Sequence, residues 1–441
     1  MESIIAMPKY ETYKDSGYVW IGKIPVDWEI SRLGACLTPI SIKNHPDLPL
    51  LSITRELGVI ERDIEDQESN HNYIPDDLSG YKLLKKGQFG MNKMKAWQGS
   101  YGVSEYTGIV SPAYFIFDFA KAINPEFFNW AIRSKLYVSY FGSASDGVRI
   151  GQWDLSKTRM KDIPFILPEE KQQELIAKFL DKKTSQIDEA ISIKYQQIGL
   201  LKERKQIIIQ QAVTKGLDPN VPMKGSCLDW IGKIPKHWEI CVLKRILKDH
   251  RQGFYTTEKY IDYGVKLARI TDIKDGILDY KDMPFVKISQ KDERLFSFRK
   301  GDFLFGRTGA GVGKFCKVVE EQRAVFASYL IKFSFDLERV SENFLELFFN
   351  SELFLSGLFS STHGGANQNI HAENVKEQII FLPPLEEQRE IYNSLVKELE
   401  DFTRVSNSLR IQIEKLKEYK TSLINSAITG KIKITPEMVE G

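Results

Sequence analysis

Metal-binding and catalytic residue patterns are missing from this sequence of 441 residues. It holds four cysteines and six histidines, and no CxxC pair occurs, so we expect neither a zinc site nor a disulfide framework. It also contains no HExxH or GxSxG motif, no paired carboxylate–lysine nuclease motif and no Asn/Asp-Pro-Pro-aromatic methylation motif. We therefore predict that the chain binds no metal or cofactor and is not itself an enzyme.

Long hydrophobic runs are missing too. No segment approaches the roughly 18–20 apolar residues that span a bilayer. The first 20 residues carry five charged side chains and no continuous apolar stretch, so we expect no signal peptide. A hydrophobic content of 42% with 12% aromatic residues is ordinary for a globular protein, and the length allows two or three cores. We expect a reduced, cytoplasmic protein.

A complete phosphate-binding loop is also absent, although residues 309–314 read GAGVGK. The nucleotide-binding pattern is G-x-x-x-x-G-K-[ST], in which the final hydroxyl holds magnesium. Thr308 occupies the position of the first glycine, and Phe315 replaces the hydroxyl residue. The sequence therefore predicts no ATP binding.

A phrase that occurs twice is the most informative feature present. Residues 14–30 read KDSGYVWIGKIPVDWEI and residues 224–240 read KGSCLDWIGKIPKHWEI, with 11 of 17 positions identical. A second pair of segments follows in each half: residues 167–176 read LPEEKQQELI and residues 382–391 read LPPLEEQREI. The chain is therefore a tandem duplication of halves of roughly 215 residues, a length typical of one or two domains.

Each half is a shared frame that carries its own insert, because the segments between the repeated phrases show little identity. The predicted divisions are 1–166 (N-terminal segment and first insert domain), 167–216 (first long helix), 217–381 (second insert domain), 382–432 (second long helix) and 433–441 (tail).

Two long helices are predicted from the segments that begin at Pro168 and Pro384 and end near Gly216 and Gly430. Apolar residues recur in both at alternating spacings of four and three, which is typical of a coiled coil. The predicted seam comprises Leu180, Ile187, Ile198, Leu201 and Ile208 in the first copy and Leu395, Phe402, Leu409, Ile413, Leu416 and Leu423 in the second.

The two helices are predicted to pair with each other in antiparallel orientation. The second copy of the repeated phrase begins only about ten residues after the first helix, a reach of about 35 Å. That reach keeps the second insert near the far end of the first helix, so the pair should carry one insert at each end with approximate two-fold symmetry. Lys205 and Lys420 share one seam position. Either their ammonium groups extend out of the seam into solvent, or each pairs with a carboxylate.

The inserts are predicted to be compact mixed α/β domains, because short strands rich in Phe, Val, Ile and Tyr alternate with glycine turns. The net charge of +2 conceals local basic segments. Five lysines and no acidic residues lie between Tyr81 and Tyr101, and six basic residues with one acid lie between Arg294 and Lys317.

These basic, amide-rich loops are candidate DNA contacts. Arginine can pair with guanine and Asn or Gln with adenine, whereas lysines hold phosphates. The candidates are Arg55, Asn92, Lys93, Lys95, Trp97, Gln98, Arg149 and Gln152 in the first insert and Arg269, Thr271, Arg307, Thr308, Lys314, Asn367, Gln368 and Asn369 in the second. The alternatives are that a basic loop is only a solvated face, and that residues such as Asn369 serve turns and helix caps.

The whole arrangement resembles the DNA-specificity subunit of bacterial Type I restriction-modification systems. The resemblance is carried by the opening K-x-S-x-x-x-W-I-G-K-I-P-x-x-W-E-I, by LPPLEEQREI at 382–391 and by LKEYKTSLINSAITGKI at 416–432, and it spans residues 14–432. Within the inserts, NKMKAWQGSYGVS and KGDFLFGRTGAGVGK are also similar to segments of such recognition domains.

The resemblance implies a non-catalytic subunit whose two recognition domains each read half of a split double-stranded DNA site. It implies that the helices set the spacing and dock two methyltransferase subunits, which methylate adenine with S-adenosylmethionine. Motor-nuclease subunits would then cleave unmodified DNA with ATP and Mg. The alternatives are a specificity subunit of a methylation-only or related phage-defence system, a coiled-coil scaffold without a DNA role, and an autonomous nuclease or methyltransferase.

Overall fold

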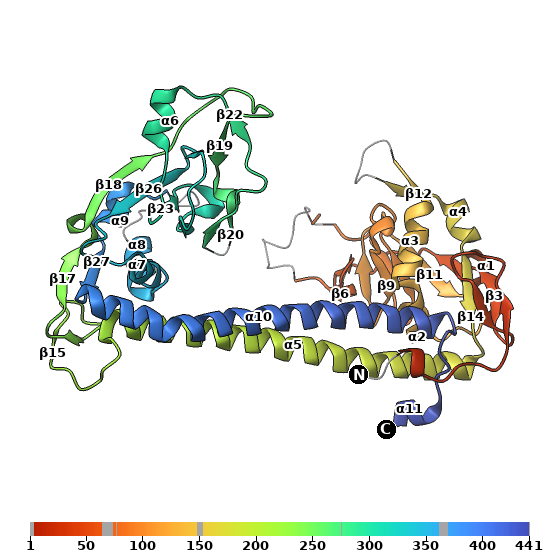
Figure 1. Ribbon diagram of the computed structural model, residues 1–441. Helices are drawn as coiled ribbons and strands as arrows, with labels where there is room; N and C mark the ends of the chain where they lie inside the picture. The colour runs from red at the N-terminus through yellow and green to blue at the C-terminus, as the bar shows by residue number, and fades with distance from the viewer. Residues whose placement is uncertain are drawn as a thin grey trace. The chain divides into compact units, whose positions relative to one another are not determined.

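The chain folds into two units, each built mainly from one half of the sequence. A computed structural model describes residues 4–63, 74–75, 77–147, 153–274, 276–360 and 369–440, and its helices and strands are drawn in Figure 1. Unit 1 comprises Met1–Tyr195 and Arg410–Gly441, and unit 2 comprises Gln196–Leu409. The predicted mixed α/β class is confirmed, since each unit combines short strands with helices. Within the described ranges, no helix is both long and apolar enough to cross a membrane.

Both predicted long helices are present: α5 spans Glu170–Lys215 and α10 spans Leu385–Ile428. Proline lies just before each of them, where it cannot interrupt the helical hydrogen bonds. Gly216 and Gly430 follow them, each with a φ of +69°. This left-handed conformation ends a helix at low strain only for glycine, which explains why both copies keep it.

In unit 1 the first half of α5 packs against the second half of α10 in antiparallel orientation. Lys194 donates to the Gln412 side chain at 2.7 Å, and six residues earlier on α5, Asp188 pairs with Lys420 at 2.6 Å. Ile187 and Leu423 lie in one buried cluster beneath these pairs. Burying a leucine contributes about 1.5–3 kcal/mol, so the apolar contacts outweigh the exposed ion pair.

In unit 2 the second half of α5 packs against the first half of α10. Ile208 and Ala212 from α5 share a buried cluster with Ile391 and Leu395 from α10. The predicted antiparallel pairing is therefore present in each unit. Among the seam residues, Leu180, Ile187, Ile208, Leu395, Leu409, Ile413 and Leu423 are buried, and Ile198, Leu201, Phe402 and Leu416 are half-buried.

The two seam lysines differ. Lys420 has the carboxylate partner that one of the two alternatives required, namely Asp188. The residue 215 positions after Asp188 is Thr403, so the second copy offers no carboxylate at the corresponding place. Lys205 is half-buried there.

The repeated phrase folds into the same strands in both units. β1 (Tyr13–Asp15) pairs with β2 (Lys23–Pro25), and β15 (Met223–Gly225) pairs with β16 (Lys233–Pro235) in the equivalent register. The frame closes where β3 (Glu29–Arg32) pairs with β14 (Pro164–Leu167), and where β17 (Glu239–Val242) pairs with β27 (Ile379–Leu382). The phrase is conserved between the copies largely because its Ile, Pro and second Trp are buried.

The divergent inserts share one strand order. In unit 1 the antiparallel sheet runs β4-β11-β8-β9, and in unit 2 it runs β18-β26-β23-β24, extended by β21 and β20. The bounds are β4 Leu37–Ile40, β11 Phe115–Phe119, β8 Phe89–Met91, β9 Tyr101–Val103, β18 Leu247–Gln252, β26 Leu330–Phe335, β23 Phe303–Gly306, β24 Phe315–Lys317, β21 Ile277–Leu278 and β20 Ile273–Lys274. Two sequences with little identity thus form one architecture.

Helix pairs cover these sheets and are tied to the long helices by one conserved glutamine. Gln173 is 1% exposed and accepts from the amide of Asn124, the N-cap of α2. Gln388 is fully buried and accepts from the amide of Ser341, the N-cap of α7. The helices are α2 Pro125–Ile132 and α3 Lys135–Ser143 in unit 1, and α7 Glu342–Phe349 and α8 Glu352–Ser360 in unit 2.

Short elements complete each unit. In unit 1 they are η1 Ile4–Ala6, α1 Leu33–Cys36, β5 Leu51–Thr54, β6 Gly58–Glu61, β7 Lys82–Leu84, η2 Ala96–Gln98, β10 Gly108–Val110, β12 Ser145–Asp146, β13 Asp154–Leu155, α4 Lys157–Asp162 and α11 Pro436–Glu440. In unit 2 they are η3 Leu243–Arg245, β19 Val265–Ala268, η4 Ile270–Asp272, β22 Phe285–Val286, α6 Gln290–Phe296, η5 Gly309–Gly311, β25 Ala324–Phe326 and α9 Ala372–Lys376.

Candidate nucleic-acid interface

The basic loop of the first insert connects β8 to β9 and is shaped by its own amide side chain. Asn92 is only 9% exposed, and its Oδ1 accepts from the backbone amide of Met94 at 3.2 Å. This contact is turn chemistry, one of the two alternatives for such residues. Lys95, three residues further on, is exposed to solvent.

The hairpin β12–β13 packs against this loop. The Lys93 ammonium pairs with Asp154 at 3.0 Å, and the Trp97 ring lies 5.1 Å from the Trp153 ring, centre to centre. The fold thus brings together the two segments that the sequence singled out separately, 92–98 and 145–155. The hairpin also contains Arg149 and Gln152, which lie outside the described residues.

Two further candidates in the first insert are less exposed than Lys95. Trp97 and Gln98, in η2, are half-buried. The Trp97 Nε1–H is buried, and no described residue accepts a hydrogen bond from it. A buried donor without an acceptor costs about 1–3 kcal/mol, so this group is ready to bind an acceptor.

The second insert brings its two candidate loops together in the same way. Strand β23 continues into Arg307 and Thr308, and Thr308 forms an antiparallel bridge with Asn369. The amide of Ile370 donates to the Arg307 carbonyl at 2.9 Å. Asn367 and Gln368, which precede this contact, lie outside the described residues.

The side chains of this second loop are available to a ligand to different degrees. Lys314 and Asn369 are exposed, while Arg307 and Thr308 are half-buried. The Nε of Arg307 is buried, and no acceptor for it lies among the described residues. An arginine guanidinium can form paired hydrogen bonds to a guanine.

The glycines of GAGVGK are explained by packing rather than by phosphate binding. A Cβ on Gly311 would collide with the Ile270 side chain, and Gly309 and Gly313 have φ values of +64° and +80°, which favour glycine. The loop leads into strand β24, whereas a phosphate-binding loop leads into the N-terminus of a helix. The local structure therefore differs from that of a phosphate-binding loop, and the absence of ATP binding stays a prediction.

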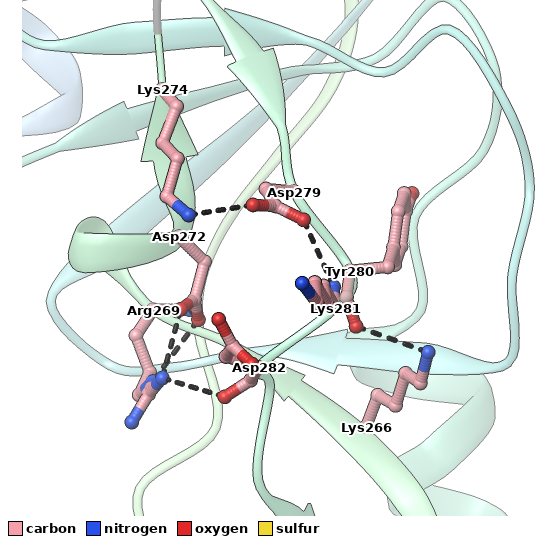
Figure 2. Close-up of polar contacts among 8 residues, drawn as sticks. All are labelled: Lys266, Arg269, Asp272, Lys274, Asp279, Tyr280, Lys281 and Asp282. Carbon is pink, nitrogen blue, oxygen red and sulfur yellow. Dashed lines mark hydrogen bonds and ion pairs between the residues drawn. The ribbon is translucent and has the colours of Figure 1, made fainter.

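Arg269 is engaged inside the protein, as Figure 2 shows. Its Nε and Nη2 donate to both carboxylate oxygens of Asp272 at 3.0 and 2.8 Å, and Nη2 also donates to the carbonyl of Asp282. This ion pair raises the pKa of Arg269. Arg269 therefore holds the turn η4, and the neighbouring Thr271 is the exposed residue of that turn. The Arg-x-x-Asp spacing is the sequence signal for this pairing.

A lysine cluster in unit 1 was not singled out from the sequence. Burial lowers the pKa of Lys82, and the nearby charges of Lys43 and Lys157 lower it further. The Lys157 ammonium lies 4.5 Å above the Phe115 ring. The cluster escaped notice because its members come from three distant segments of the chain. Among the residues that the structure covers, no group of three or more His, Cys, Asp or Glu side chains could hold a metal ion.

Residues 236–418 match the family described as the Type I restriction modification DNA specificity domain. This segment contains the second insert and most of α10. The chain is similar, over most of its length, to specificity subunits of type I restriction-modification systems.

Among its relatives is the MjaVIII specificity subunit of Methanocaldococcus jannaschii, 24% identical over 98% of this chain and 99% of that protein. The EcoKI specificity subunit of Escherichia coli K12 is 23% identical over 73% of this chain and 69% of that protein. Among solved structures, the HsdS subunit from Thermoanaerobacter tengcongensis superposes with a TM-score of 0.53 at 16% identity, covering 95% of this chain and 100% of that one. A chain from a structure of a type I R-M system superposes with a TM-score of 0.67 at 15% identity, covering 92% of this chain and 98% of that one.

Proposed function

We propose that this chain reads a split double-stranded DNA site, with one half read by each insert. The observation that carries the proposal is the common architecture of two unrelated insert sequences. Both use the same order of four strands, and both bring a basic loop against a second loop rich in amide or guanidinium groups. A shared scaffold with different reading loops is what two half-sites of different sequence require.

The chain acts without catalysis of its own, and its partners supply the chemistry. Two methyltransferase subunits methylate adenine with S-adenosylmethionine, and motor-nuclease subunits cleave unmodified DNA with ATP and Mg. A row of exposed apolar residues on α5 supports helix docking by a partner. Leu200 and Ile207, both in unit 2, are 64% and 48% exposed and lie seven residues apart, so they form one stripe.

An exchange of inserts tests this function. Residues 33–163, which lie between the frame strands β3 and β14, are replaced by the matching insert of another specificity subunit. Together with the methyltransferase subunit, the chimaera should methylate adenine at a site in which only one half has changed. Single-molecule sequencing of methylated DNA gives both halves and the spacer.

The control is the reciprocal exchange between β17 and β27, which should change only the other half. Changes in both halves after either exchange would contradict independent reading. The isolated chain should show no methylation, DNA cleavage or ATP hydrolysis, and robust activity of the partner-free chain would contradict the assignment of catalysis to partners.

A further inference from the structure

Each insert contains a second hairpin, apart from the basic loop, that lies along an edge strand of its sheet. In unit 1 the hairpin β5–β6 contacts β9, and in unit 2 strand β21 of the hairpin β20–β21 pairs with β24. The turns contain Gly58 and Gly276, with φ values of +75° and +78°. β9 and β24 hold the same place in the strand order, so the two hairpins adjoin corresponding strands.

The turn of the first hairpin is fixed by hydrogen bonds from all sides. The Thr54 hydroxyl accepts from the amide of Leu57 at 3.1 Å and donates to the carbonyl of Gly58 at 3.2 Å. Nη2 of Arg133, at the end of α2, donates to the carbonyls of Glu56 at 2.6 Å and Arg55 at 3.3 Å. The polar backbone groups of the turn are thus largely satisfied within the protein.

Arg133 binds the carbonyls of this turn. Within the described part of the chain, no carboxylate lies within ion-pair distance of its guanidinium. Burial lowers the pKa of Arg133, whereas the nearby Tyr101 and Glu56 side chains act to raise it. Holding the cation here therefore has an energetic cost that these groups and the two carbonyls offset. A Cβ at Gly58 would lie 2.1 Å from Nη1 of Arg133, which shows how closely the guanidinium packs on the turn.

This fixed turn presents an apolar side chain to solvent. Leu57 is 69% exposed, and its neighbour Arg55 is engaged with Glu56 at 2.8 Å. In the second insert Ile277, just after the turn glycine, is 53% exposed, and the neighbouring Lys274 is engaged with Asp279 at 2.6 Å (Figure 2). One exposed aliphatic residue is ordinary, but one on each of two hairpins that adjoin corresponding strands of unrelated inserts indicates a shared use.

We propose that Leu57 and Ile277 are specificity-determining residues that contact the C5-methyl group of thymine, one in each half-site. The inference rests on the proposed function of DNA reading. The thymine methyl is the apolar group that a base pair presents in the major groove, and an aliphatic side chain recognises it by contact. A turn held rigid before binding loses little conformational entropy on contact, so Arg133 is the positioning residue for Leu57.

The test uses the complete complex with its methyltransferase subunits and its methylated site. Each thymine of the site is replaced in turn by uracil, which lacks only the C5-methyl group. We expect binding to weaken about fourfold at one thymine of each half-site, the effect of one buried methyl group. Leu57→Ala should abolish this uracil effect in the first half-site only, and Ile277→Ala in the second only. Leu217→Ala removes a leucine that is 48% exposed outside the inserts and should leave both effects intact.

Arg133→Ala should abolish the same uracil effect as Leu57→Ala, and the double variant should show no further loss. Arg133→Lys keeps the charge but not the forked donor and should not restore the effect. If Arg133 were merely structural, its loss would lower stability and weaken all positions alike.

The proposal is overturned if no uracil substitution weakens binding of the unsubstituted complex, or if the effects survive in the Leu57→Ala and Ile277→Ala variants. A complex with no preference for its site over scrambled DNA would instead refute the proposed function itself.

Discussion

Arginine has two uses in the second insert, and its contacts distinguish them. Arg269 has its donors engaged by Asp272 and Asp282, so it stabilises a turn. Arg307 retains a buried Nε that no described residue accepts from. Both were predicted as DNA contacts because the sequence gives the residue type and the loop. The sequence does not show whether Arg269 binds Asp272, three residues away, or a DNA base.

Substituting a cation that holds a phosphate should affect DNA binding differently from substituting one that contacts a base. Lys314 is exposed, so Lys314→Ala should weaken binding to all sequences and reduce the slope of log K against log salt by about 0.9, the loss of one phosphate contact. Arg307→Ala should instead relax one base position at a cost of about 1–3 kcal/mol. Binding titrations at several salt concentrations, on specific and scrambled DNA, measure both effects.

Lys236→Ala is the control, because Lys236 is an exposed lysine of the repeated phrase outside the inserts. It should leave the slope unchanged. Equal slopes for the Lys314 and Lys236 variants would contradict the prediction that Lys314 contacts a DNA phosphate.

Among the elements, the long helices could be predicted and the sheets could not. Proline and glycine at the ends and a seam of apolar residues are local signals, and they located α5 and α10 to within a few residues. The pairing of β4 with β11 joins segments far apart in sequence, which local patterns do not encode. The turn contact of Asn92 could not be told from a base contact by sequence, because both use the same amide group, and its contact with DNA stays a prediction.

The exposed stripe on α5 should bind the methyltransferase subunit. Leu200→Asp places a charge in the middle of an apolar contact and should weaken association at least tenfold, since a buried unpaired charge is strongly unfavourable. Gln197→Asp introduces the same charge at an exposed polar position of α5 and should have little effect. Calorimetric titration measures association, and circular dichroism checks that helix content is preserved. Equal affinities for the two variants would show that the methyltransferase subunit does not bind at Leu200.

For the whole molecule, we expect the long helices to set the spacing of the half-sites. One heptad adds about 10.5 Å to a helix, and DNA advances about 3.4 Å per base pair. Seven residues inserted after Leu201, with a matching heptad in the facing layer of α10, preserve the seam. The spacer of the methylated site should lengthen by up to about three base pairs, as sequencing of methylated DNA would show.

The half-site sequences should stay the same in this variant, while overall activity falls because three base pairs also rotate the duplex by nearly a third of a turn. An insertion of four residues rotates the seam and should disrupt folding or partner docking. An active double-heptad variant with its original spacer would disprove the role of the helices as a ruler.

The order in which the segments of the two units occur along the chain has a consequence for protein synthesis. Unit 2 is one continuous stretch, whereas unit 1 combines the first part of the chain with the last. The ribosome therefore releases all of unit 2 while the core of unit 1 still lacks Leu423, Ala427, Ile428, Ile432 and Ile434. The unit that is made first is completed last. Any chain that terminates early leaves this apolar surface uncovered, where chaperones and proteases can distinguish it from a finished molecule.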